Sequence, residues 1–374
     1  MARLIEETGE FSELLDRLRT EMLVAVDTEA ASFHRHRDRI YLLQLSTRTE
    51  TWLVDPLAVV GFAGLGELLA DPAIEFVFHD ADYDLRLLGQ EFGIRVTRLF
   101  DTRVAAQFLN EPGIGLAALL EKHFGVQLDK QFQRADWSLR PLSPPMLRYA
   151  ATDTEHLPRL RDVMHQLLLE RGRLAWVEEE CELLTRVRWA EPELPEVQAL
   201  SAKGTSTLSP RALAVFRELY VWRTRTADSL DRAAFRIIGN EALLVMAEHP
   251  PQDLAALTQV RGVSRDLVAR NGAQVLAAVQ RGLALPESEL PRRPRPPRHR
   301  PDPAFEGRME RLKDLRVQLT TRLELAPGLL CPNWLLEAIA RSAPRDLSQL
   351  GQIAGIRRWQ LEEFGGPLLE AVAK

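Results

Sequence analysis

The chain has 374 residues, of which 45% are hydrophobic and 27% charged, as in an ordinary globular protein. It has no run of 18 apolar residues and begins without a basic segment followed by an apolar one, so we expect neither a transmembrane helix nor a secretory signal. The two cysteines, Cys181 and Cys331, lie far apart, which favours a reducing cytoplasm and argues against a disulfide or zinc framework.

Charge is distributed unevenly along the chain. Residues 1–200 hold 22 lysines and arginines against 34 acidic residues, a net charge of −12, whereas residues 201–374 hold 26 against 19, a net charge of +7. An acidic front half suits a domain that carries metal-binding carboxylates, and a basic back half suits one that holds a polyanion. Chance variation between solvated faces is the alternative.

The front half predicts a layered α/β domain. Short apolar runs predict four strands, at residues 23–29, 40–45, 51–54 and 75–78. Helical spacing of apolar residues predicts helices at residues 5–20, 63–70, 116–124 and 171–190, and one that Asp80 caps and Gly93 ends. Three strands at hairpin spacing, followed by alternating strands and helices, indicate a sheet with an antiparallel start.

The first predicted strand ends in two acids, Asp27 and Glu29. Positions i and i+2 of a strand share a face, so the two carboxylates project from the same side. Like charges held that close repel, and each is costly to keep ionised unless a cation lies between them. A divalent cation would meet this need; a capping acid beside a solvated one is the alternative.

Further polar residues follow in order along the chain. Asp84 lies early in the helix that comes after His79. A polar loop at residues 130–142 precedes a helix that carries Tyr149 and Asp153, which share a face because they are four residues apart. A core tyrosine and a capping acid would give the same spacing.

Together, Asp27-x-Glu29, Asp84 and Tyr149-x-x-x-Asp153 resemble the DEDD superfamily of 3′→5′ exonucleases, in the branch with tyrosine in its third motif. The preceding loop, with the string Asp-Trp-x-x-Arg-Pro-Leu at residues 136–142, is similar to that of the bacterial ribonuclease D family. The resemblance covers roughly residues 1–170 and implies an α/β fold of the ribonuclease H-like type.

The resemblance also implies a role for each matching residue. Asp27, Glu29, Asp84 and Asp153 would bind two divalent cations, and Tyr149 would orient the attacking water. Two such ions can stabilise the attacking and leaving oxygens of a phosphodiester together. Hard oxygen ligands favour Mg²⁺ or Mn²⁺ over zinc.

The back half contains an internal repeat with an offset of 93 residues. A pattern of proline, aspartate, leucines and glycine at residues 251–263 recurs at residues 344–356, and the same offset pairs Asn240 with Asn333. A shared offset over many positions indicates duplication. Each unit is predicted to be all-helical and resembles the HRDC domain. No nucleotide-binding Gly-x-x-x-x-Gly-Lys-Ser/Thr motif of a helicase is present.

These observations predict a multidomain chain. Between residues 291 and 301 lie five arginines and five prolines, which favour a stiff, extended linker. We expect an exonuclease domain at residues 1–172, followed by a connecting helix with a linker at residues 173–209. A first HRDC domain at residues 210–285, the Pro/Arg-rich linker at residues 286–302 and a second HRDC domain at residues 303–374 complete the chain.

Nucleic-acid contacts are predicted in both halves, at Thr28 and Arg140 in the front and at Trp222, Arg223, Arg225 and Arg232 in the first HRDC domain. A core position for the aromatic residues is the alternative. In the second unit leucine replaces Trp222 and glutamine replaces Arg225, which weakens the expectation that this unit contacts nucleic acid.

We therefore expect a metal-dependent 3′→5′ exoribonuclease that releases nucleoside 5′-monophosphates and trims structured RNAs such as transfer-RNA precursors. We expect it to be a cytoplasmic monomer that associates with no membrane and has no obligate protein partner. We also expect that a protein without residues 205–374 retains its chemistry on short single strands. A DNA 3′→5′ exonuclease and a catalytically silent nucleic-acid-binding protein are the alternatives, because recognition of the 2′-hydroxyl leaves no readable motif.

Overall fold

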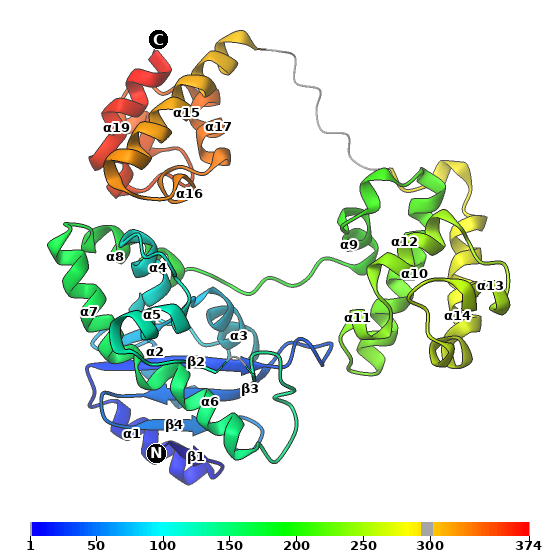
Figure 1. Cartoon of the computed structure of the whole chain (residues 1–374), viewed down its shortest axis with the longest axis horizontal. Helices are drawn as coiled ribbons and strands as arrows, with labels where there is room; N and C mark the ends of the chain where they lie inside the picture. Colours follow the sequence, from blue (N-terminus) through cyan, green and yellow to red (C-terminus); the bar gives the residue numbers. More distant parts are fainter. Residues whose placement is uncertain (1, 130, 293–301, 374) are drawn as a thin grey trace.

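The computed structural model describes residues 2–129, 131–292 and 302–373 (Figure 1). Its front domain is built on a six-stranded mixed sheet with the order β1-β4-β3-β2-β5-β6. The strands are β1 (Arg3–Ile5), β2 (Leu23–Ala30), β3 (Ile40–Ser46), β4 (Thr51–Val54), β5 (Glu75–Phe78) and β6 (Leu99–Asp101). The pairs β2–β3 and β3–β4 are antiparallel, whereas β1–β4, β2–β5 and β5–β6 are parallel. The predicted α/β domain with an antiparallel start is therefore confirmed.

Eight helices of the described chain pack with this sheet. They are α1 (Thr8–Leu18), α2 (Phe62–Leu69), α3 (Asp82–Phe92), α4 (Thr102–Phe108), α5 (Leu116–Phe124), α6 (Pro144–Glu155), α7 (Leu157–Glu170) and α8 (Leu174–Leu184). Helix α6 crosses β2, β3 and β4, and Ser143 caps its first turn by accepting from the Met146 N–H at 3.4 Å. This crossing places α6 over the three strands β2, β3 and β4 (Figure 1).

The start of α3 differs from the prediction. Helix α3 begins at Asp82, and Asp80 does not cap it. The backbone of Asp80 has a φ of 70°, in the left-handed region, which is not the conformation of a capping residue. The carboxylate of Asp101 instead accepts from the backbone N–H groups of Asp80 and Ala81 at 3.2 and 2.8 Å. Asp101 also caps α4, so one buried acid orders the starts of two helices.

Two all-helical units follow, as the repeat predicted. The first contains α9 (Pro195–Ser201), α10 (Pro210–Ser229), α11 (Ala234–Ile237), α12 (Asn240–Glu248), α13 (Leu254–Gln259) and α14 (Arg265–Ala284), with 3₁₀ turns at Thr205–Thr207 and Glu287–Glu289. The second contains α15 (Pro303–Leu323), α16 (Pro327–Leu330), α17 (Asn333–Ser342), α18 (Leu347–Gly351) and α19 (Arg358–Ala373). Residues 293–301, most of the predicted Pro/Arg-rich linker, lie outside the described residues.

The two units share their internal contacts at the 93-residue offset. Arg223 donates to the Ile238 carbonyl and to Asn240 Oδ1, at 3.3 and 2.8 Å. Arg316 makes the matching pair of bonds, to the Cys331 carbonyl and to Asn333 Oδ1, at 2.7 and 2.9 Å. Gly262 and Gly355 have φ values of 88° and 90°, a conformation that side chains rarely adopt.

The second unit packs directly on the front domain. Trp359 is 2% exposed. Its ring stacks on Trp176 of α8, with the ring centroids 4.8 Å apart, and meets Phe108 of α4 edge-on, with the centroids 5.4 Å apart. Residues of this unit and of the front domain form one continuous hydrophobic core. Removing the second unit would expose this aromatic cluster, so the structure argues against the expectation that chemistry on short single strands survives deletion of residues 205–374.

Helix capping differs between the two units at this contact. In the first unit Ser264 caps α14 with its own hydroxyl. The corresponding residue of the second unit is Arg357, and the cap is supplied from outside: Glu179 of α8 accepts from the backbone N–H groups of Arg358 and Trp359, at 2.8 and 3.1 Å. The start of α19 is therefore completed by the front domain.

The first unit has a hydrophobic core of its own. It meets the front domain through the segment at residues 31–37, between β2 and β3. The Ala233 N–H donates to the His34 carbonyl at 3.1 Å, and Arg37 donates to Asp228 at 2.9 Å. This junction combines polar contacts with one edge-on aromatic contact, between Phe33 and Phe235 at a centroid distance of 6.3 Å, whereas the junction of the second unit is a continuous apolar core.

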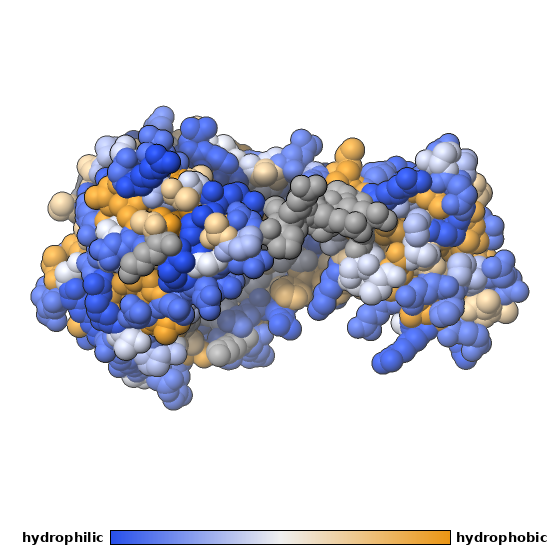
Figure 2. Space-filling model, turned by 90° about the horizontal axis from the view of Figure 1, so that it is seen from above, coloured by the Kyte–Doolittle hydropathy of each residue, from blue (hydrophilic) through white to orange (hydrophobic). Residues whose placement is uncertain are grey.

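The exterior is mainly hydrophilic on the face that Figure 2 shows, with hydrophobic residues in smaller groups. No helix among the described residues is both long enough and apolar enough to span a bilayer.

The aromatic junction yields a first prediction. We expect Trp359→Ala to lower the free energy of unfolding by about 3–5 kcal/mol, because it removes a large buried side chain and leaves a cavity. Urea denaturation followed by circular dichroism measures this change. Trp334→Ala is the matched control, since Trp334 is 55% exposed in the same unit, and we expect it to cost less than about 1 kcal/mol. Equal effects of the two substitutions would contradict the shared core.

Candidate active site

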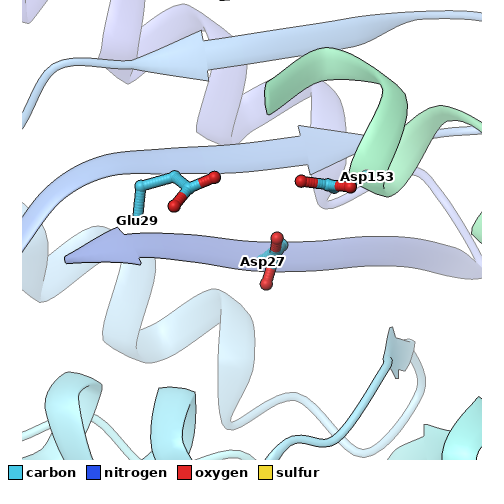
Figure 3. Close-up of side chains that lie close together, drawn as sticks. All are labelled: Asp27, Glu29 and Asp153. Carbon is cyan, nitrogen blue, oxygen red and sulfur yellow. The ribbon is translucent and has the colours of Figure 1, made fainter. Parts of the chain in front are cut away.

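Three carboxylates meet where β2 runs beneath α6. Asp27 and Glu29 project from the same face of β2, as the strand period predicted, and Asp153 comes from α6 (Figure 3). One carboxylate oxygen of each lies within 4.8 Å of the others. Such a group of hard oxygen donors fits a divalent cation such as Mg²⁺ or Mn²⁺.

Asp84 lies beside this group, on α3. It is 6% exposed, and it accepts a hydrogen bond from the hydroxyl of Thr28. Because Thr28 alternates with Asp27 and Glu29 along β2, its side chain lies on the opposite face of the strand. The structure therefore brings three of the four predicted acids into one tight group and holds the fourth against the other side of β2.

The four acids strongly affect one another. Burial raises the pKa of Asp27, and the nearby charge of Asp153 adds to the rise. Burial likewise raises the pKa of Glu29 and Asp84, with repulsion from Asp27 contributing in both cases. Burial raises the pKa of Asp153 to about 7. The raised pKa values favour the protonated carboxyl groups when no cation is bound, and a bound cation would oppose this.

Tyr149 lies one helical turn before Asp153, in contact with the loop that precedes α6. Its ring meets Phe132 and Trp137 at centroid distances of 5.9 and 6.1 Å. Burial and the charge of Asp153 raise the pKa of Tyr149 above its usual range, so the hydroxyl stays protonated. It can donate a hydrogen bond but cannot serve as a base near neutral pH.

A pocket of about 380 Å³ opens beside Tyr149. The loop before α6 forms one wall and α6 forms the other. Its lining includes Phe132, Gln131, Arg148, Tyr149 and Thr152. The sequence singled out this loop by its motif but gave no indication that Phe132 packs against the tyrosine.

His79 has a structural position. Its Nδ1 lies 2.9 Å from the hydroxyl of Thr102, which donates to the Phe78 carbonyl at 3.1 Å. Burial, with repulsion from Arg103, lowers the pKa of His79 to about 4, so the ring is neutral at physiological pH.

Two predicted nucleic-acid contacts in the front domain require correction. Thr28 is 8% exposed and its hydroxyl is engaged by Asp84. Arg140 pairs with Asp55, at 2.8 Å between Nη2 and Oδ1, and also donates to the carbonyls of Tyr41 and Trp137. Both side chains therefore hold the domain together instead of facing a ligand.

Two of the four predicted contacts in the first helical unit require the same correction. Trp222 is 7% exposed and donates to Gln274 at 3.2 Å, and Arg223 is 5% exposed and bound to Asn240. The core alternative was right for the tryptophan. Arg225 and Arg232 are exposed, and Arg225 has a single long contact, of 3.5 Å, with Glu196.

The raised pKa values give a second prediction. Because the pKa of Asp153 rises from 3.8 to about 7 on folding, the folded metal-free protein binds more protons than the unfolded chain in this interval. The contribution of Asp153 to stability is therefore fully present below pH 3.8 and is lost as pH rises through about 7. We expect 10 mM Mg²⁺ to raise the melting temperature more at pH 8 than at pH 5.5.

Thermal denaturation with and without Mg²⁺ checks this, with Asp153→Asn expected to reduce the dependence on pH. Asp162→Asn is the control, because the hydrogen bond from Arg48 lowers the pKa of Asp162 instead. A Mg²⁺ effect that does not change with pH would contradict proton displacement at the site.

Comparisons with known proteins agree with this geometry. A family model described as 3′-5′ exonuclease matches residues 2–169, and one described as HRDC domain matches residues 212–279 and 305–372. A ribonuclease D from Gluconacetobacter diazotrophicus is 33% identical over 374 residues, with 98% of this chain and 91% of the relative covered.

Solved structures give the same picture. Ribonuclease D from Escherichia coli, described as an exoribonuclease involved in structured RNA processing, has a TM-score of 0.73 and 25% identity, with 100% of this chain and 99% of that chain covered. The catalytic core of RRP6 from Trypanosoma brucei has a TM-score of 0.69 and 30% identity, over 76% of this chain and 81% of that chain. The chain, a 3′-5′ exonuclease domain followed by two HRDC domains, belongs to the ribonuclease D family.

Proposed function

We propose that this chain hydrolyses RNA from its 3′ end and releases nucleoside 5′-monophosphates, with two divalent cations at the acids of β2, α3 and α6. The observation that carries the proposal is the convergence of Asp27, Glu29 and Asp153 within 4.8 Å, beside Tyr149, in a member of the ribonuclease D family. Mg²⁺ and Mn²⁺ are the cations that this donor set favours.

Each residue has a defined part in the reaction. Asp27, Glu29 and Asp153 would hold the cations, and Asp84, which accepts from Thr28, would complete the set of acids. When bound, the cations stabilise charge on the attacking and leaving oxygens and acidify water. Tyr149 keeps its proton and donates from its hydroxyl, which fixes the orientation of the attacking water.

We propose that the pocket beside Tyr149 is the binding site of the terminal nucleotide. Its volume of about 380 Å³ suits a nucleotide, and the partly exposed ring of Phe132 offers a face for a base.

The RNA that leads to this pocket is proposed to pass along the first HRDC domain. Arg232 is exposed at the junction with the segment at residues 31–37, and Arg225 is exposed on α10. The net charge of +7 on residues 201–374 supports attraction of a polyanion. Structured RNAs with single-stranded 3′ tails, such as transfer-RNA precursors, are the proposed substrates.

We further infer that the protein acts as a monomer in the reducing cytoplasm. Both cysteines are unpaired and buried, which suits that compartment.

The exonuclease activity is tested with a 5′-labelled RNA hairpin that has a single-stranded 3′ tail, in Mg²⁺ or Mn²⁺. We expect a ladder that shortens from the 3′ end and stops at the stem, and a loss of roughly a thousandfold in Asp27→Asn, since a cation supplies several kcal/mol of transition-state stabilisation. Asp16→Asn, at an 81% exposed side chain, is the matched control. Faster digestion of a DNA hairpin of the same sequence would reassign the substrate, and no digestion of either would refute the activity.

The role of Tyr149 is tested separately. Tyr149→Phe removes only the hydroxyl, and we expect turnover at saturating Mn²⁺ to fall roughly 10- to 100-fold because the attacking water loses its orientation. Affinity for Mn²⁺ should not change. Tyr220→Phe, which removes a hydroxyl bonded to Gln198 in the first HRDC domain, serves as the control. Unchanged turnover of Tyr149→Phe would rule out the positioning role.

A further inference from the structure

Gln44 lies in the middle of β3 and is fully buried, at 0% exposure. Neither its Oε1 nor its Nε2 has a hydrogen-bond partner among the described residues. A buried amide that is taken from water without a partner costs free energy, and nearly all buried polar groups in proteins are paired. An unpaired buried amide of this kind calls for a partner nearby.

The register of the sheet shows where that partner lies. In the antiparallel pair β2–β3, Gln44 is directly opposite Asp27. Directly opposed residues share a face, with their Cβ atoms about 4.5–5.5 Å apart. The carboxamide of Gln44 is therefore a lateral neighbour of the central acid of the site, on the face that α6 covers.

The neighbours of Gln44 along β3 and across to β4 are apolar. Leu53 is its partner on β4, and Leu42 precedes it by two residues on the same face of β3. The buried hydroxyls of Ser46 and Thr154 are bonded to each other at 2.7 Å. The carboxylate of Asp27 is thus the polar group that the sheet register brings to the amide.

We propose that Gln44 is a positioning residue for the metal site, whose Nε2 donates to the carboxylate oxygen of Asp27 that faces away from the cations. This inference rests on the proposed metal-dependent function. A hydrogen bond from an amide N–H to a carboxylate oxygen is charge-assisted and therefore stronger than one between neutral groups. The bond fixes the direction in which Asp27 presents its other oxygen.

The chemical identity of the residue supports this role. A lysine or arginine at this position would neutralise Asp27 and compete with the cations, whereas an amide orients the carboxylate and leaves its charge intact. A hydrophobic residue would satisfy the packing of β3, whose other buried residues are mostly apolar, but would give no direction to the acid. Partners that orient metal ligands typically change metal affinity by 10–100-fold when removed.

Gln44→Met tests the proposal, because methionine keeps the length of the side chain and removes both amide atoms. Gln360→Met is the matched control: Gln360 is 3% exposed, and its amide is satisfied by the Leu330 carbonyl at 2.7 Å and by the Arg357 N–H at 2.9 Å. Mn²⁺ affinity is measured by calorimetry on the full chain, and the melting temperature is measured without metal.

For Gln44→Met we expect affinity for Mn²⁺ to fall roughly tenfold or more, with a metal-free melting temperature no lower than that of the wild type. For Gln360→Met we expect unchanged affinity and a melting temperature lower by about 2–4 °C. Wild-type affinity in Gln44→Met would overturn the inference, whether or not that variant melts earlier. Absence of Mn²⁺ binding in the wild type would instead overturn the proposed function.

Discussion

The mutual repulsion of carboxylates at the end of β2 is the constraint on which the rest of the front domain depends. Burial and like charge both raise the pKa of these acids, so the fold keeps them together against their electrostatic preference. The strand fixes Asp27 and Glu29 through its period of two, and α6 adds Asp153 by crossing the same strand. Only rigid elements with a large buried core can hold such an arrangement, and the six-stranded sheet provides it.

Uncharged groups surround these acids. Thr28 donates to Asp84, His79 is neutral, and Gln44 lies opposite Asp27. Arg140, a cation of the adjacent loop motif, is bound by Asp55 and the carbonyls of the loop, so its charge supports the loop instead of neutralising the site. A site that must attract cations gains from this arrangement, because a fixed positive charge nearby would weaken the binding of a mobile one.

The two HRDC domains show how one duplicated unit acquired two uses. Both keep the arginine–asparagine contact that joins their helices. In the second domain, Glu179 of the front domain replaces the internal helix cap. Trp359 packs in the aromatic junction, whereas the corresponding residue of the first domain, Asp266, is exposed. The second domain shares the hydrophobic core of the exonuclease domain, whereas the first meets the front domain through hydrogen bonds, ion pairs and one aromatic contact at the segment of residues 31–37.

The sequence alone determined what depends on short-range periodicity: the shared face of Asp27 and Glu29, the helical spacing of Tyr149 and Asp153, and the offset of the repeat. Only the tertiary structure decided which polar residues are free, because their partners lie far away in the chain. Arg140 and Asp55 are 85 residues apart, and Arg173 of the front domain reaches the Leu323 carbonyl of the second HRDC domain across 150 residues. A local pattern gives the side of an element on which a residue lies, whereas packing decides what meets that side.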